Sequence, residues 1–367
     1  MNLFSFIDKY GNYTFDEVAF TEVDNIIMSM LSYLDLEGIV SSNRVNKRTI
    51  QEVGDNFFRT YSKEQKNIIS IKNAIKVFRY IKDTKRYKDL LLYNYVYKTS
   101  GDSQFGALTI ELNKKLVYVS FEGTDHLIGG WKEDFMLSYM FPVMSQKRAI
   151  NYVNRNFLMS GKKIILGGHS KGGNLALVAG MYANIFVRKK IVKIYNNDGP
   201  GLLLDQIESK NYLRILSKLV HMIPNYSIVG IMMRHGDDME VVRSFRKSAY
   251  SHDPTTWVVN DLAFERSKLS TFSEFFDKRL LEWLMKYDKK QRKSFFEGLF
   301  MIFERVKIDS LIDIMDNKKL VLKVLSESKE LDNETKTILR ELIFMIFDCF
   351  KDASLEDIRS LFNKKVK

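Results

Sequence analysis

The run from Lys163 to Ala176 constrains the fold more than any other part of this sequence. It begins with aliphatic residues, breaks at Gly168-His169-Ser170-Lys171-Gly172, and continues into a helix-forming stretch. This order predicts a strand, a sharp turn and a helix, with Ser170 at the bend. A serine in such a turn has a strained backbone, and Gly168 and Gly172 leave the space that it requires.

Ser170 is therefore a candidate nucleophile. Its hydroxyl would lie at the N-terminus of the following helix, where unpaired amides favour the negative charge that develops in acyl transfer. The amide of Lys171 is the expected first donor of an oxyanion hole. The second donor should follow an earlier strand, and the turn at Glu122-Gly123-Thr124-Asp125 offers the amide of Thr124, with its hydroxyl as a further donor.

A serine also needs a base, and three histidines follow Ser170 in the chain. His221 lies in an apolar strand, where a neutral packed ring is expected. His235 precedes Gly236-Asp237-Asp238 in a predicted turn. His252 lies in a polar loop after the last strand-like segment, which makes it the preferred base.

The acid that orients the base should also follow a strand. Asp198 comes directly after the predicted strand 191–195, beside the turn that carries Ser170. A structural role as the cap of the next helix is the rival interpretation of Asp198. Asp237 and Asp238 are alternative acids, and the segment from Asp125 to Tyr139 is interpreted either as a mobile lid or as a fixed helix.

Strands and helices alternate through the middle of the chain. Strands are predicted at residues 90–98, 105–112, 116–121, 163–166, 191–195, 219–223 and 240–243, and helices at 146–159, 172–185 and 203–217. Such alternation favours an α/β-hydrolase fold with a mostly parallel central sheet and helices on both faces. Residues 90–262 form the expected core.

Helical segments are predicted on both sides of this core. Residues 1–89 are expected to form a helical segment that packs on the sheet, with Thr21 and Asp24 at the start of one helix and apolar residues at helical spacing from Ile68 to Ile81. Residues 263–367 are expected to be all-helical, beginning at the capping box Thr271-Phe272-Ser273-Glu274.

The net charge of +12 is concentrated in residues 44–89, which carry thirteen Lys or Arg and five Asp or Glu. No nucleic-acid-binding motif accompanies this charge, so we expect a solvated helix surface and no nucleic-acid partner. The basic face is also compatible with peripheral membrane contact. The sequence leaves the oligomeric state open.

Apolar residues make up 45% of the chain, but no apolar run approaches the roughly 18 residues that cross a bilayer. The first residues have neither a basic leader nor a long apolar stretch, so a cytoplasmic location is expected. The single cysteine, Cys349, cannot form an internal disulfide and is interpreted as core packing.

The motifs resemble a known family. Phe121-Glu122-Gly123-Thr124-Asp125, followed by Trp131 and Asp134, and then Gly168-His169-Ser170-Lys171-Gly172-Gly173, are similar to two blocks of the class 3 triacylglycerol lipases. The chain resembles the bacterial Mbeg-like, lipase-related proteins more closely, through Thr14-Phe15, Asp24 and His252-Asp253-Pro254. The resemblance spans residues 1 to 260.

This resemblance implies a serine carboxylic-ester hydrolase that acts on a small acyl ester or a lipid and requires no cofactor or metal. Glu122 and Lys171 replace an arginine and a leucine of the lipase blocks, although neither change removes a backbone donor. The lipases take their acid from a loop that here reads Pro224-Asn225-Tyr226-Ser227 and offers no carboxylate, so the triad would need Asp198, with Asp237 and Asp238 as the alternatives. The alternative functions are a non-catalytic scaffold that binds a protein or lipid, and a thioesterase or acyl transferase.

Overall fold

The structure, a computed structural model, describes residues 1–61, 69–100, 103–124, 128–308 and 318–345. An eight-stranded sheet runs through its centre, in the order of the chain from β1 to β8. The first four strands pair antiparallel, and β4 to β8 pair parallel. The strands are β1 (Arg48–Thr49), β2 (Leu91–Ser100), β3 (Ser103–Asn113), β4 (Leu116–Phe121), β5 (Lys163–His169), β6 (Ile191–Asn197), β7 (Leu219–Pro224) and β8 (Glu240–Val242).

This sheet, flanked by helices, confirms the predicted α/β-hydrolase fold. Alternate residues of each strand face opposite sides, so Ile164 and Leu166 of β5 belong to one hydrophobic core and Ile165 to the other. Reactive groups in such a sheet lie at the carboxyl ends of the parallel strands, where β5 and β6 end at His169 and Asn197.

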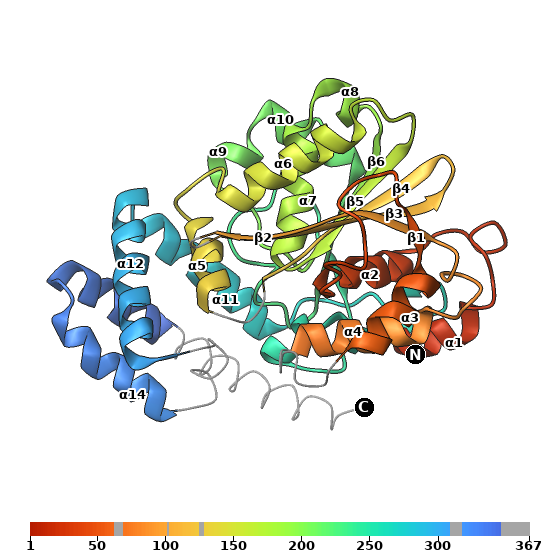
Figure 1. Cartoon of the computed structure of the whole chain (residues 1–367). Helices are drawn as coiled ribbons and strands as arrows, with labels where there is room; N and C mark the ends of the chain where they lie inside the picture. Colours follow the sequence, from red (N-terminus) through yellow and green to blue (C-terminus); the bar gives the residue numbers. More distant parts are fainter. Residues whose placement is uncertain (62–68, 101–102, 125–127, 309–317, 346–367) are drawn as a thin grey trace.

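The N-terminal helices cover one face of the sheet (Figure 1). They are α1 (Leu3–Tyr10), α2 (Glu22–Met30), α3 (Ile50–Thr60) and α4 (Ile69–Ile81). α2 begins at Thr21 with the predicted capping box to Asp24. Asp24 also forms a fully buried ion pair with Arg86 at 2.6 Å, which ties α2 to the chain just before β2. The short strand β1 was not predicted within this segment.

Several basic residues of the 44–89 segment have acidic partners inside the chain. Lys47 contacts Glu111 at 2.5 Å, and Lys82 contacts Asp55 at 2.8 Å. The local positive charge is therefore partly neutralised by the fold.

The opposite face of the sheet carries α6 (Met144–Phe157), α7 (Lys171–Tyr182) and α8 (Ile185–Arg188) (Figure 1). The single helix predicted over 203–217 is wrong. It is divided into α9 (Leu204–Ile207), α10 (Lys210–Leu213) and a short 3-10 turn, because the Ser209 side chain accepts from the amide of Tyr212 and starts a new helix. The helix predicted over 172–185 likewise ends at Tyr182, and Asn184 caps α8.

The C-terminal helices form a hydrophobic core of their own. They are α11 (Thr271–Lys286), α12 (Lys289–Val306), α14 (Lys318–Glu327) and a helix over residues 333–345, preceded by a two-stranded sheet of β9 (Val259–Asn260) and β10 (Ala263–Phe264). The predicted N-cap of α11 is wrong by one residue: the cap is Ser270, whose side chain accepts from the amide of Ser273, and not Thr271. Cys349 lies outside the described residues, and the boundaries at residues 89 and 262 stay predictions.

The helix α5 (Ile128–Met136) joins the two parts of the molecule. Its aromatic residues Trp131 and Phe135 pack against the C-terminal core, and α5 contacts α12 beside the sheet (Figure 1). Within the described chain, no helix has the length and apolar character needed to cross a bilayer.

Candidate active site

Ser170 lies at the sharp turn between β5 and α7. Its backbone has φ 58° and ψ −134°, a conformation in which only a few non-glycine residues are found. The Ser170 amide donates to the carbonyl of Asn197 at 2.9 Å, which fixes the turn against the end of β6. A Cβ at Gly168 would lie 2.3 Å from the backbone of Gly172, and one at Gly172 would lie 2.1 Å from the carbonyl oxygen of Phe121. Both glycines are therefore required by backbone contacts, as predicted.

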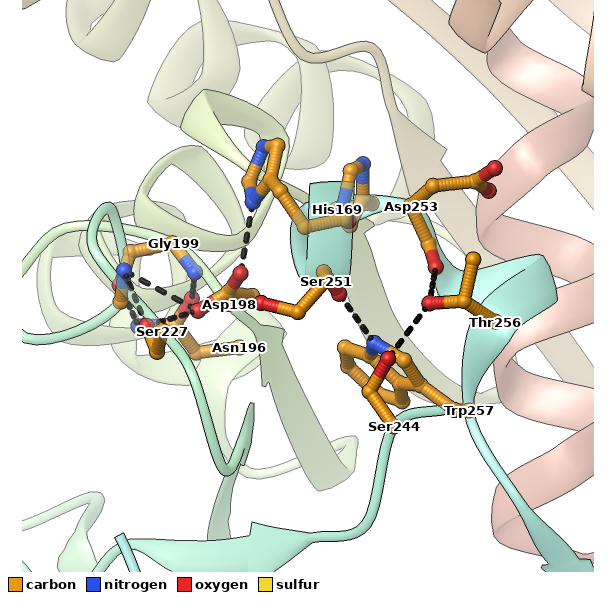
Figure 2. Close-up of polar contacts among 12 residues, drawn as sticks. His169, Asn196, Asp198, Gly199, Ser227, Ser244, Ser251, Asp253, Thr256 and Trp257 are labelled. Carbon is orange, nitrogen blue, oxygen red and sulfur yellow. Dashed lines mark hydrogen bonds and ion pairs between the residues drawn. The ribbon is translucent and has the colours of Figure 1, made fainter. Parts of the chain in front are cut away.

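Asp198 follows β6 at a second strained position, with φ 49°. The Asn196 side chain closes this turn by accepting from the amide of Gly199 at 3.1 Å and donating to its carbonyl at 3.2 Å. The Asp198 carboxylate is fully buried, and its Oδ1 accepts from the Ser227 hydroxyl at 2.5 Å and from the Gly230 amide at 3.0 Å (Figure 2). The other oxygen, Oδ2, is left for a different partner.

That partner is His252. The His252 Nδ1 lies 2.6 Å from Asp198 Oδ2, so the structure brings together the predicted base and the preferred acid, 54 residues apart. The helix after Asp198 begins at Leu204 with Leu203 as its cap residue, so the rival interpretation of Asp198 as a helix cap is wrong. Because Asp198 Oδ1 is held by two donors, the carboxylate is fixed in the orientation that meets the ring.

The loop that carries His252 is held by an independent set of contacts. His252 ends a 3-10 turn (Ser248–His252), and the buried indole of Trp257 donates from Nε1 to the Ser251 carbonyl at 2.9 Å (Figure 2). The Thr256 hydroxyl donates to the Asp253 carbonyl at 2.7 Å and lies 2.8 Å from the Ser244 hydroxyl.

His169, the residue before Ser170, ties the His252 loop to the turn, a role that sequence reasoning missed. Its Nε2 donates to the His252 carbonyl at 2.7 Å, while the buried hydroxyl of Tyr33 lies 3.0 Å from its Nδ1. The rings of His169 and His252 are 4.4 Å apart between centroids. Figure 2 shows His169 beside Asp198 and the 251–257 loop. Among the hydrogen bonds of these described residues, none joins the Ser170 hydroxyl to the His252 ring.

The two candidate oxyanion donors are on facing elements. Lys171 is the first residue of α7, so its amide is among those that a helix leaves unpaired at its N-terminus. Thr124 is buried just after β4, and its hydroxyl donates to Asp134 Oδ2 at 2.6 Å. That hydroxyl has one proton, which it gives to this hydrogen bond, so in this conformation only the Thr124 amide is available to an oxyanion, and the role of the hydroxyl stays a prediction.

The Lys171 side chain makes a buried contact that the sequence did not predict. Its ammonium lies 3.3 Å from Glu133 Oε2 and 3.8 Å from Asp134 Oδ1, and the side chains of Lys171 and Glu133 are almost fully buried. This cluster ties the start of α7 to α5. A lysine at the position where the lipase motif has leucine was the available signal.

A small apolar cavity of about 70 Å³ adjoins Ser170. Its lining residues come from the turn itself, from α5, from the segments after β6 and β7 and from the C-terminal helices, and they include Trp131, Phe135, Leu280, Trp283 and Phe296. The rings of Phe135 and Phe296 are 4.7 Å apart between centroids. The predicted lid segment therefore contains a helix packed under α12, although Asp125 and residues 126–127 lie outside the described residues.

The two other histidines lie together at a different place. The ring of His221 in β7 is 4.6 Å from the ring of His235 between centroids, and its Nδ1 is 3.6 Å from Asp237 Oδ2. Burial lowers the pKa of His235 to about 3, so its ring is neutral at pH 7. Asp237 accepts from the hydroxyl of Tyr212 at 2.6 Å, and Asp238 is exposed. Neither carboxylate is the partner of His252. The set of His221, His235 and Asp237 has the residue types that bind metal ions.

This chain is similar to several known proteins. A lipase called M37 matches over 57% of this chain and 69% of its own, with 14% identity and a TM-score of 0.36. A fungal lipase solved in complex with an inhibitor matches over 59% of this chain and 77% of its own, with 12% identity and a TM-score of 0.32. No curated protein matches the chain. The model of the Mbeg1-like family matches residues 81–301, which is more than half of the sequence, and the chain therefore belongs to the Mbeg1-like family.

Proposed function

We propose that this protein is a serine carboxylic-ester hydrolase of the lipase or esterase type. Ser170 is the nucleophile, His252 the general base and Asp198 the residue that orients His252. The observation that carries the proposal is the 2.6 Å contact between His252 Nδ1 and a fully buried Asp198. A carboxylate in this position stabilises the charged imidazole that forms when the base takes a proton.

The reaction would proceed in two steps. In the first, the Ser170 Oγ attacks the acyl carbon while His252 Nε2 takes the hydroxyl proton, and the same proton then passes to the leaving alcohol. In the second, His252 takes a proton from a water molecule that attacks the acyl group on Ser170, and the proton returns to the Ser170 oxygen as the acid leaves. Catalytic hydrogen bonds are often long or poorly aligned before substrate binds.

The amides of Thr124 and Lys171 would bind the oxygen that becomes negative in both steps. Two donors on rigid backbone need no reorganisation as the charge develops. The hydrogen bond from the Thr124 hydroxyl to Asp134 supports this role, because it anchors the residue whose amide must face the site. The buried contact of Lys171 with Glu133 anchors the opposite donor in the same way.

The substrate that fits the site has an apolar acyl group. The cavity beside Ser170 is lined largely by apolar side chains, among them Val229, Met232, Leu280 and Phe296. Its volume of about 70 Å³ is well below the roughly 300 Å³ at which ligand pockets begin. We therefore propose that α5 and α11 separate from the turn when an ester or lipid enters, so that they act as the cap of the site.

A scaffold without catalysis is the second candidate, and two observations favour it. Ser170 is only 8% exposed, and no hydrogen bond joins its hydroxyl to His252 among the described residues. Hydrolysis of nitrophenyl esters of increasing chain length by the wild type and by Ser170→Ala separates the two functions. An enzyme hydrolyses at least one of these esters, and the variant loses that activity. A scaffold gives equal background rates for both proteins.

A further inference from the structure

A second polar cluster lies outside the proposed catalytic residues. His221 is in β7, where it pairs with Asn196 of β6. His235 and Asp237 are in the segment between β7 and β8, which is held in place by two backbone hydrogen bonds between Leu202 and Arg234, at 2.9 and 3.0 Å. The cluster therefore joins the sheet to a loop whose position is already fixed by its backbone.

Each of the three residues has a buried polar atom without a partner among the described residues. His221 Nε2, His235 Nε2 and Asp237 Oδ2 are shielded from solvent and have no hydrogen-bond partner in the described part of the chain. Buried polar atoms are nearly always paired, so the unpaired His235 Nε2 and Asp237 Oδ2 point to a missing ligand, which His221 Nδ1, 3.6 Å from Asp237 Oδ2, can share. One ligand atom from each residue lies within 4.8 Å of the others. His221 Nδ1 and Asp237 Oδ2, at 3.6 Å, are too far apart for a hydrogen bond.

These spacings fit a shared metal ion. Ligand atoms at about 2.1 Å from a tetrahedral zinc ion lie roughly 3.4 Å from one another, close to the 3.6 Å between His221 Nδ1 and Asp237 Oδ2, so Nδ1 is the His221 atom that would bind the ion. Neighbouring groups also orient the ligands, as they do in known metal sites. The Tyr212 hydroxyl donates to Asp237 Oδ1 at 2.6 Å, which leaves Oδ2 directed to the cluster, and the His235 ring bonds the carbonyl of Met232.

We propose that His221, His235 and Asp237 bind one divalent transition-metal ion, with zinc as the best fit and water as the fourth ligand. Two imidazoles and one carboxylate suit this class of ion and do not suit magnesium or calcium, which prefer oxygen ligands. The bound ion would link β7 to the segment that precedes β8. It would fix to the sheet the segment that carries Met232 and Met233, both of which line the cavity beside Ser170.

The test is zinc binding to the full chain, purified with its affinity tag removed and treated with a chelator. Competition with a chromophoric chelator should give one zinc per chain. Zinc at about 100-fold its Kd should raise Tm by roughly 3–4 °C. Cobalt in place of zinc should give the visible absorption of a tetrahedral site.

Matched variants locate the site. Asp237→Asn and Asp238→Asn make the same chemical change at adjacent residues, and Asp238 is exposed outside the cluster. Asp238→Asn should bind zinc as the wild type does, whereas Asp237→Asn and His235→Ala should bind it at least tenfold more weakly. The proposal is overturned if the wild type binds no zinc below about 10 µM, or if Asp237→Asn binds it like Asp238→Asn. If a variant fails to fold, the cobalt spectrum of the wild type is the test: the absorption of a tetrahedral site supports the proposal, and its absence overturns it. Labelling of Ser170 by a fluorophosphonate is a separate readout, so failure here leaves the proposed hydrolase untouched.

Discussion

Replacing Asp198 with asparagine tests the proposed base and acid through a single atom. Asp198 Oδ1 accepts from Ser227 and from Gly230, so the oxygen of an asparagine side chain must stay on that side. The amide NH₂ group then faces His252 and donates to Nδ1 where the carboxylate accepted from it. This fixes the imidazole with its proton on Nε2, where it cannot take a proton from Ser170.

The expected loss of kcat follows from this tautomer of His252. The equivalent exchange in serine proteases lowers kcat by about 10⁴-fold, or about 5 kcal/mol of barrier. Stability should change far less, because Ser227 and Gly230 keep their acceptor, and we expect a loss of about 1 kcal/mol. Asp198→Ala removes that acceptor as well and should cost about 2–3 kcal/mol. The pair of variants therefore separates chemistry from folding.

The assay measures ester hydrolysis and urea unfolding on the same preparations. Asp238→Asn is the control, since it makes the same change at an exposed position. If folded Asp198→Asn hydrolyses the ester at more than a tenth of the wild-type rate, His252 does not depend on Asp198 in the way that we propose.

Three further predictions concern the fold. Asp24→Asn leaves the fully buried Arg86 without its counter-charge and should lower the free energy of unfolding by about 3–5 kcal/mol in urea titrations. The control Asp83→Asn removes a charge from an exposed pair with Lys82 and should lower it by less than about 1 kcal/mol. Equal losses for the two variants would refute the argument. Gly172→Ala places a Cβ 2.1 Å from the Phe121 carbonyl oxygen and should lower the free energy of unfolding by about 2 kcal/mol, measured by thermal unfolding. In the control Gly161→Ala the added Cβ has no atom within 4 Å, so the free energy of unfolding should not change. Burial raises the pKa of the half-buried Asp277 to about 6, so its charged form destabilises the fold, and this penalty grows as the pH rises from about 4 to 6. Asp277→Asn should therefore raise the free energy of unfolding by on the order of 1 kcal/mol at pH 7.5, after discounting for solvent screening, and by almost nothing at pH 4. An increase of the same size at both pH values would contradict burial as the cause.

The sequence predicted best the features that local chemistry determines. The turn at Ser170 needs glycines on both sides, and the backbone contacts of Gly168 and Gly172 agree with that requirement. The strands of the parallel sheet were found within a few residues because their apolar runs are continuous. The position of Asp198 after a parallel strand made it the preferred partner of His252, and their contact fits that preference.

The features that the sequence missed depend on contacts between distant segments. The role of His169 depends on Tyr33 and on the carbonyl of His252, which lie 136 and 83 residues away. The hydrogen bond that the Thr124 hydroxyl donates to Asp134 is also a contact that no local pattern reveals. His221 and His235 are 14 residues apart in different elements, so no sequence spacing indicates a cluster, and only the fold places both beside Asp237.

The central claim is that Ser170 is a working nucleophile, and covalent labelling tests it most directly. The wild type, treated with a fluorophosphonate and analysed by mass spectrometry, should gain one adduct that maps to Ser170, and Ser170→Ala should gain none. The absence of labelling in the folded wild type, or an adduct that persists in Ser170→Ala, would contradict the claim.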